Sequence, residues 1–272
     1  MRHISLRYRA GLASAAITLA MAAAPAAQAV PVTEWAVTVD AVFANVVPAG
    51  VVVSLDNKSL SWGSGTFGPS GLAISNAPSN TQVTTNGPGV ANVSLTHTNN
   101  PINAGGTNHL TNVNIEWTLT LTPLAPNPGP LDMNPIFSLS FLETPNADAI
   151  CADGNPSPGP GNIHANGCAD IFVFGSTALN TPFSYDGEDY FLSFTEYTSG
   201  LNKLFDPACF AVTGSPASCL GFQTAENAAT TIQFALMITS EPVSIPEPAT
   251  LGLFGLALAG MAGVIRRRKL QA

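Results

Sequence analysis

Three carboxylates, those of Asp186, Glu188 and Asp189, surround Gly187 in the second half of the chain. Carboxylate oxygens are the ligands that calcium prefers, so these side chains could hold a Ca²⁺ ion. Acidic residues around a glycine are also typical of a solvated hairpin turn between two strands. We expect the hairpin turn and no bound cofactor, and calcium at Asp186, Glu188 and Asp189 is the alternative.

The four cysteines form a second set of reactive side chains, and all lie in the second half of the chain: Cys151, Cys168, Cys209 and Cys219. An even number of cysteines in an exported chain favours disulfides over catalysis or metal binding, and three pairings are possible. We favour the bridges between sequence neighbours, Cys151–Cys168 and Cys209–Cys219. A zinc site that includes His164 is the alternative, although neither cysteine pair has the short spacing of zinc ligands.

His97 lies in the motif Thr96-His97-Thr98-Asn99, where a strand ends and a turn begins. The Asn99 side chain can hydrogen-bond its own backbone and start the turn, and His97 can brace a loop by bonding a carbonyl. We predict these structural roles and no metal. The functional alternative makes His97 a general base, or a metal ligand together with His109 and His164.

Motifs for catalysis are absent. The sequence contains no Gly-x-Ser-x-Gly, His-Glu-x-x-His, P-loop or EF-hand motif. A pair of carboxylates could still hydrolyse a glycosidic bond, but the distance between them is a structural quantity. Because no residue is singled out for catalysis, we predict that the protein is not an enzyme.

Alternation of polar and apolar residues runs from Asn112 to Thr122, with the apolar residues at odd positions. This two-residue period is typical of a strand with one buried face. Similar patterns predict strands at 33–43, 136–143, 188–197 and 230–239, and shorter strands at 51–55, 60–62, 72–75, 91–96 and 170–174. Turns rich in Gly and Pro separate them, and no helical period is evident. The segment 30–244 is therefore predicted to be all-β, an antiparallel, jelly-roll-like β-sandwich.

Residues 1–29 have the organisation of a secretory signal peptide. Arg2, Arg7 and Arg9 form a basic region, and the stretch 11–24 is apolar and rich in Ala and Leu. Ala27-Gln28-Ala29 fits the rule for cleavage between small residues. The mature chain should therefore begin near Val30, outside the cytoplasm.

The C-terminal segment, residues 245–272, places the motif Pro246-Glu247-Pro248 before an uncharged, largely apolar stretch at 249–265. That stretch reaches the lower limit of length for a transmembrane helix. The basic residues that follow should stay on the cytoplasmic side by the positive-inside rule, and they are Arg266, Arg267, Arg268 and Lys269. Proline lacks an amide donor, so the motif should remain extended, where an enzyme can bind it.

This order of motif, apolar span and basic block closely resembles the PEP-CTERM sorting signal of bacteria. The resemblance implies processing by an exosortase-type enzyme, with the tail held in the inner membrane until then. It also implies an association with exopolysaccharide and biofilm. We therefore expect the protein at the cell surface or in the extracellular matrix of a Gram-negative bacterium.

A second resemblance runs over most of the segment 30–244. Besides Thr96-His97-Thr98-Asn99, it rests on Leu60-Ser61-Trp62-Gly63, on Ser70-Gly71-Leu72, and on the segments 151–156 and 167–173. These motifs are similar to those of the THxN family of PEP-CTERM proteins, which has no established activity. The resemblance therefore implies where the protein is delivered, but it implies no enzymatic reaction.

Acidic residues dominate the exported segment. The only basic residues between Val30 and Ile245 are Lys58 and Lys203, whereas this segment contains 16 acidic residues. Its formal charge is therefore −14. Nucleic acid is a poor partner for such a surface, because binding to phosphate needs Lys and Arg.

These observations predict an exported surface or matrix protein of unknown molecular activity. The alternative is a glycan- or calcium-binding β-sandwich, or else a hydrolase, that acts on extracellular polysaccharide. Sugar binding by a sandwich usually needs exposed aromatic side chains. Trp35 and Trp117 are in phase with apolar neighbours and should lie in the core, whereas the sequence leaves the place of Trp62 open.

Overall fold

The computed structural model describes residues 30–102, 108–126, 129–158, 163–175, 179–199 and 201–243. The signal peptide expected at 1–29 and the sorting signal expected at 245–272, with its membrane span, lie outside this part of the chain. Within it, no helix has the length and apolar character needed to cross a membrane.

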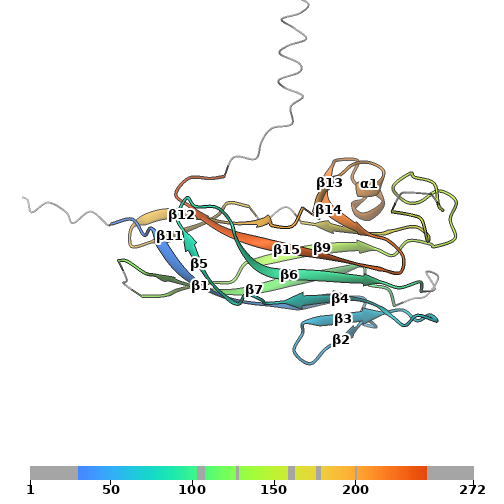
Figure 1. Cartoon of the computed structure of the whole chain (residues 1–272), viewed down its shortest axis with the longest axis horizontal. Coiled ribbons are helices and arrows are strands. Elements are labelled where there is room, and N and C mark those ends of the chain that lie inside the picture. The colour runs from blue at the N-terminus through green and yellow to red at the C-terminus, as the bar shows by residue number, and fades with distance from the viewer. Residues whose placement is uncertain are drawn as a thin grey trace, which may run out of the picture.

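The described residues form two antiparallel sheets that pack against each other (Figure 1). In the order of pairing, the first sheet contains β13 (Asn202–Leu204), β14 (Cys219–Thr224), β10 (Asp170–Phe174), β9 (Ile136–Leu142), β7 (Asn112–Pro123), β1 (Glu34–Val47) and β5 (Asn80–Thr84), with β8 (Leu131–Met133) also paired to β7. The second sheet contains β11 (Thr181–Tyr185), β12 (Glu188–Glu196), β15 (Ala228–Thr239), β6 (Val90–Asn99), β4 (Ser70–Ser75), β3 (Ser59–Trp62) and β2 (Val52–Val53). The prediction of an all-β, antiparallel sandwich is confirmed.

The main hydrophobic core lies between the two sheets and follows from the alternation within each strand. Trp117 of β7 contacts Phe194 of β12 in the opposite sheet, with 4.4 Å between the ring centroids. Trp35 of β1 meets Tyr190 of β12 edge-on at 5.3 Å. Both tryptophans are buried, as predicted, and Trp62 is buried too, with 2% of its surface exposed. Burial of each large apolar side chain contributes roughly 1.5–3 kcal/mol, so these contacts hold the sheets together.

Every strand predicted from alternation is present, with bounds that differ by a few residues. The strands β5, β8, β11, β13 and β14 were not predicted. β5 is polar and buries only Val83, and β11 contains Pro182, which cannot donate to a strand ladder. The helix α1 (Ala208–Thr213) also escaped prediction, because six residues are too few to show a helical period.

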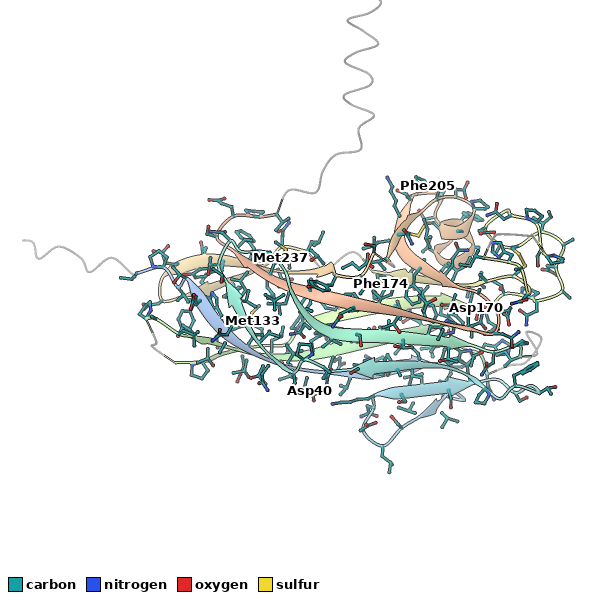
Figure 2. All side chains as sticks on the ribbon, in the orientation of Figure 1. Asp40, Met133, Asp170, Phe174, Phe205 and Met237 are labelled. Atoms are coloured by element: carbon teal, nitrogen blue, oxygen red, sulfur yellow. A yellow bond between two sulfur atoms is a disulfide. The ribbon has the colours of Figure 1, made fainter. Side chains whose placement is uncertain are left out.

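Both favoured disulfides are formed, Cys151–Cys168 and Cys209–Cys219. The first closes the long connection between β9 and β10, and the second joins α1 to the start of β14. Asp170, at the start of β10, lies toward the end of the sandwich that carries α1, whereas Met133 lies toward the opposite end (Figure 2).

The three carboxylates around Gly187 lie on the hairpin between β11 and β12, as expected. Tyr185 pairs with Glu188, and the two residues between them, Asp186 and Gly187, have positive φ angles of 50° and 83°. Two successive positive φ angles explain why an Asp-Gly pair stands at this turn.

Candidate functional site

Polar side chains take inward-facing positions at one end of the sandwich, where several strands end or begin. In β9, Leu139 and Phe141 face the core, and Glu143 occupies the next inward position. The same phase places further buried polar residues at this end, namely Asp170 in β10, Thr224 in β14, Glu226 just after it, and His97 and Asn99 in β6. Antiparallel pairing brings the strand ends together, since Asp170 pairs with Thr224.

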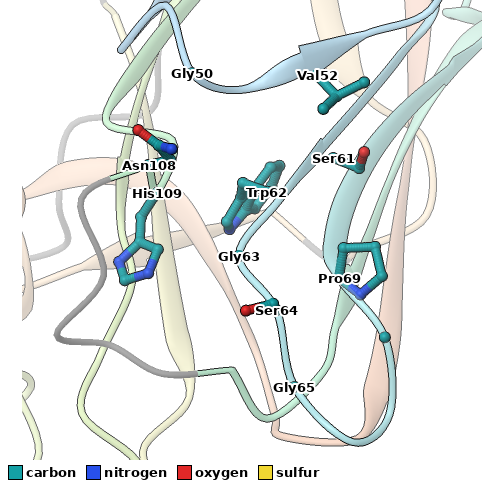
Figure 3. Close-up of a pocket in the computed structure, with 11 residues that line it drawn as sticks. Gly50, Val52, Ser61, Trp62, Gly63, Ser64, Gly65, Pro69, Asn108 and His109 are labelled. Carbon is teal, nitrogen blue, oxygen red and sulfur yellow. The ribbon is translucent and has the colours of Figure 1, made fainter.

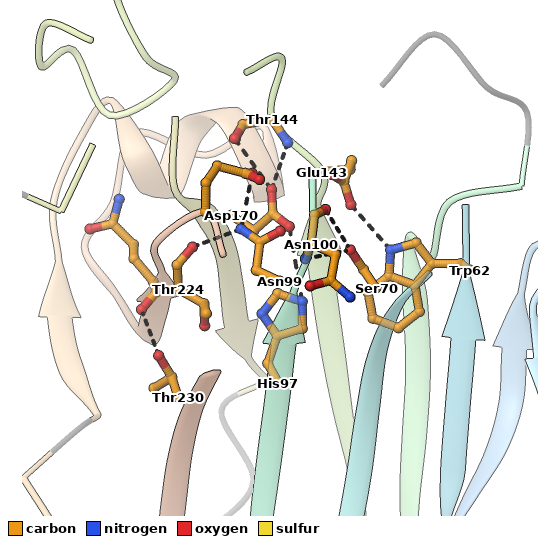
Figure 4. Close-up of polar contacts among 12 residues, drawn as sticks. Trp62, Ser70, His97, Asn99, Asn100, Glu143, Thr144, Asp170, Thr224 and Thr230 are labelled. Atoms are coloured by element: carbon orange, nitrogen blue, oxygen red, sulfur yellow. Dashed lines mark hydrogen bonds and ion pairs between the residues drawn. The ribbon is translucent and has the colours of Figure 1, made fainter. Parts of the chain in front are cut away.

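The carboxylates of Glu143, Asp170 and Glu226 converge, and we call them the carboxylate cluster. One oxygen atom from each lies within 4.8 Å of the other two, and all three residues are buried. Among the described residues, Oε1 of Glu143, Oδ2 of Asp170 and Oε2 of Glu226 have no hydrogen-bond partner. Each side chain thus keeps one buried oxygen without a donor. Figure 4 shows Glu143 bonded to Trp62 and Asp170 bonded to Thr144.

The other oxygen of each carboxylate accepts a hydrogen bond that orients it. Trp62 Nε1 donates to Glu143 Oε2 at 3.1 Å, and the backbone N–H of Thr144 donates to Asp170 Oδ1 at 2.9 Å. Asn99 Nδ2 donates to Glu226 Oε1 at 3.1 Å. Donors from the second sheet and from the loop after β9 therefore fix the cluster in place.

His97 lies beside the cluster and does not bond a carbonyl, contrary to our expectation. Its ring is fully buried, neither ring nitrogen has a hydrogen-bond partner in the described part of the chain, and Nε2 is 3.9 Å from Asp170 Oδ2. The ring stacks on Trp62, with 5.7 Å between centroids and 7° between planes. Burial lowers the pKa of His97 to about 3, so the imidazole is neutral at physiological pH.

Asn99 also differs from expectation, because its side chain does not bond its own backbone. Its Nδ2 donates to the Thr224 carbonyl at 2.9 Å and to Glu226, while its Oδ1 is buried without a partner among the described residues. Thr96, on the same strand, shares a 2.9 Å hydrogen bond with Thr231 of β15. The Asn99 side chain therefore orients a carboxylate of the cluster and does not form the turn.

Burial is the main cause of the raised pKa values of the three carboxyl groups in the cluster. Burial, with the charge of Glu226 adding to it, raises the pKa of Glu143 to about 7. Burial also raises the pKa of Glu226 to about 7, and burial together with the charge of Glu143 raises that of Asp170 well above its usual range. Of the two lysines in the described part of the chain, Lys58 bonds Asp40 and Lys203 lies over Phe205. Protons or a bound cation must therefore neutralise the carboxylates.

The connection between β9 and β10 contains a second polar group. His164 Nδ1 accepts the Ala169 N–H at 3.0 Å, so Nε2 carries the proton that bonds Asp153 Oδ2 at 2.9 Å. Burial raises the pKa of Asp153, but hydrogen bonds, of which the first is from Gln223, outweigh it and lower the pKa. The sulfur of Cys151 is bonded to Cys168, so it is not a thiolate ligand, and the zinc alternative with His164 is wrong. His164 instead braces this loop.

The remaining candidate residues do not converge on a metal. Ligand atoms of Asp186, Glu188 and Asp189 do not gather within 4.8 Å of one another. His97 lies beside the cluster, and His164 lies in the loop closed by the Cys151–Cys168 disulfide. His109 lines a pocket, so the three histidines are not ligands of one ion.

A pocket of about 560 Å³ lies next to Trp62 (Figure 3). Its polar lining comes from Ser61, Ser64, Asn108 and His109. Trp62 separates this pocket from the cluster, because its ring lines the pocket while its Nε1 bonds Glu143. None of the three carboxylates lines the pocket.

Sequence reasoning missed Glu143 and Glu226 and named Asp170 only within a family motif. The signal was an acidic residue in the inward phase of a strand, as in the series Leu139, Phe141, Glu143. Phe222 and Thr224 of β14 and Glu226 just after it repeat this pattern. Such residues are rarely buried without a partner, so their phase alone marks them for attention.

Comparison with known families matches residues 244–269 to the PEP-CTERM protein-sorting motif. The chain thus carries the signal of an exported protein sorted to the cell envelope, and this signal implies processing by an exosortase-type enzyme. The match includes Pro246-Glu247-Pro248 and the block Arg266–Lys269. A search of curated proteins finds no match. The resemblance to the THxN family rests on the motif residues alone.

Proposed function

We propose that the protein is a non-enzymatic component of the cell surface or extracellular matrix of a Gram-negative bacterium. The observation that carries this proposal is the sorting motif at 244–269, which follows closely after the last strand, β15, ends at Thr239. On this proposal the tail anchors the chain in the inner membrane until the exosortase-type enzyme processes it. The sandwich is then released to the surface, in association with exopolysaccharide.

The character of the sandwich supports a structural role. Two disulfides suit an oxidising compartment outside the cytoplasm. A charge of −14 on residues 30–245 favours solubility and disfavours nucleic acid. The buried carboxylates have raised pKa values, as catalytic acids often do, but they do not line the neighbouring pocket, so a substrate seated there would not touch them.

A triple substitution of the sorting motif, Pro246→Ala with Glu247→Ala and Pro248→Ala, tests the delivery. In the native host we expect the variant to accumulate in the inner-membrane fraction with its basic block intact. Glu188→Gln, in β12 and outside the sorting motif, is the matched control and should be sorted normally. Equal surface display of the triple variant and the wild type would contradict the proposal.

A glycan-binding role is the second candidate, and the pocket beside Trp62 is the observation that favours it. Serine, asparagine and histidine side chains line this pocket, and such groups hydrogen-bond sugar hydroxyls. The test is a glycan array with the mature protein, with and without calcium. Saturable binding that is lost in His109→Ala would support this role and overturn a purely structural one.

A further inference from the structure

We infer that the carboxylate cluster of Glu143, Asp170 and Glu226 is a binding site for a hard divalent cation, Ca²⁺ or Mn²⁺, which joins the two sheets of the sandwich. This inference does not depend on the proposed role at the cell surface. It also differs from the calcium site considered at the β11–β12 hairpin.

The spacing of the carboxylates suits such an ion. Their three oxygens lie within 4.8 Å of one another, and calcium binds oxygen at about 2.3–2.6 Å, so opposite ligands stand about 5 Å apart. An ion between them can therefore contact all three. One oxygen of each carboxylate is held by Trp62, Thr144 or Asn99, which leaves the other oxygen, Oε1 of Glu143, Oδ2 of Asp170 and Oε2 of Glu226, available as a ligand.

Two neighbouring side chains give independent support. Oδ1 of Asn99 and both ring nitrogens of His97 are fully buried and have no hydrogen-bond partner within the described residues. Leaving one buried polar atom unpaired costs about 1–3 kcal/mol, so several at one place call for a common partner. A cation can be the partner of Asn99 Oδ1 and of one of the two His97 nitrogens, because an amide oxygen is a calcium ligand and the unprotonated nitrogen of a neutral imidazole is a ligand of transition metals.

The position of His97 Nε2 places this shared partner at the carboxylate cluster. It lies 3.9 Å from Asp170 Oδ2, too far for a hydrogen bond but within the span that one bridging ion covers. Its stacking on Trp62 holds the ring in this direction. With His97 as a ligand Mn²⁺ would be favoured, whereas with oxygen ligands alone Ca²⁺ would be favoured.

The ion would add a further connection between the two sheets, which the Trp62–Glu143 and Asn99–Thr224 hydrogen bonds already join at this end. Asn99 and His97 belong to β6 in one sheet, whereas Glu143 and Asp170 flank the connection from β9 to β10 in the other. The loop closed by the Cys151–Cys168 disulfide packs closely over the cluster at Gly167, where a β-carbon would come within 3.0 Å of Glu226 Cγ. Since Gly167 also has φ of +134°, glycine is required for this close cover. We expect slow exchange of the ion in consequence.

The experiment uses the full chain in detergent micelles, stripped with EDTA and then titrated with Ca²⁺, Mn²⁺, Mg²⁺ or Zn²⁺. Thermal unfolding and metal content by mass spectrometry are recorded at about pH 7.5. At a hundredfold excess of free ion over its Kd, we expect Tm to rise by roughly 5–10 °C. About one ion of Ca²⁺ or Mn²⁺ should remain bound per chain after dialysis.

Single, shape-conserving substitutions locate the site: Glu143→Gln, Asp170→Asn and Glu226→Gln. Each should abolish most of the rise in Tm, while the metal-free variants remain folded because a buried charge has been removed. The control combines Asp186→Asn and Glu188→Gln on the hairpin and should keep the full rise.

Wild-type protein that neither retains an ion nor gains Tm with Ca²⁺ or Mn²⁺ would overturn the inference, and the cluster would then be neutralised by protons alone. A rise in Tm that is lost only in the hairpin variant would overturn it as well. The wild-type measurements decide the question even if a cluster variant fails to fold.

Discussion

Trp62 contacts two different surroundings with one ring system. One part of the indole lines the pocket, the ring face stacks on His97, and Nε1 holds Glu143. This residue was the tryptophan that alternation could not place, because Leu60-Ser61-Trp62 is too short to establish a phase. Its role depends on His97 and Glu143, which are distant from it in sequence, and such contacts are not visible in local patterns.

Replacing Trp62 by Phe should lower the free energy of unfolding by more than the lost packing alone would. The variant leaves Glu143 Oε2 without its donor, and an unpaired buried acceptor costs about 1–3 kcal/mol. Trp117→Phe is the control, since Trp117 Nε1 is itself unpaired among the described residues and that variant loses packing alone. Denaturant unfolding in EDTA measures both, and equal losses of free energy of unfolding would contradict the importance of the Trp62–Glu143 bond.

The metal-free protein should be more stable at about pH 5.5 than at about pH 8. Glu143 and Glu226 have pKa values of about 7 in the folded state against an ordinary 4.5, so the folded state holds more protons between these values. Stability is then lost as pH rises through this range. His97 acts in the opposite direction, since its pKa of about 3 removes stability as pH falls below 6.5. Three carboxyl groups, Asp170 included, outweigh one imidazole.

Chemical denaturation in EDTA across this pH range measures the effect. The double variant Glu143→Gln with Glu226→Gln should flatten the profile. A free energy of unfolding that increases from pH 5.5 to pH 8 in the metal-free wild type would show that the carboxyl groups do not control it.

Most strands with a buried apolar face could be predicted from the sequence, whereas the edge strands β5, β11 and β13 could not. β7 buries every second residue over its 12 residues, and β15 buries Ile232, Phe234, Leu236 and Ile238 in the same way. β5 and β13 bury one residue each, because an edge strand gains its order from one neighbour and not from a core face. The cluster escaped prediction for a related reason: its carboxylates come from strand ends that approach only when the sheets fold.

The two disulfides should contribute differently to the cluster. Each closes a short loop, which is worth about 3 kcal/mol in the chain-entropy model. The Cys151–Cys168 loop also covers the cluster, so Cys151→Ser with Cys168→Ser should expose the Thr144 amide that bonds Asp170. Cys209→Ser with Cys219→Ser is the control.

Hydrogen exchange at the Thr144 amide distinguishes the two disulfides. We expect exchange at least tenfold faster in the first double variant, and near-normal exchange in the second. Equal protection in both variants would mean that the loop does not shield the cluster.

The whole molecule combines an exported sandwich with a sorting signal. Its acidic body, its two disulfides and its PEP-CTERM motif are all consistent with export to the cell envelope. The motif was predictable from the sequence because it is local and its residues are contiguous. The task of the sandwich was not, because no catalytic motif marks it.

Intact-mass analysis of the mature protein from its own host tests the central claim most directly. The account predicts an N-terminus near Val30, a C-terminus at or near Pro246–Pro248, and a mass lowered by two hydrogens for each disulfide. A mature chain that retains Arg266–Lys269 would contradict processing through the sorting signal.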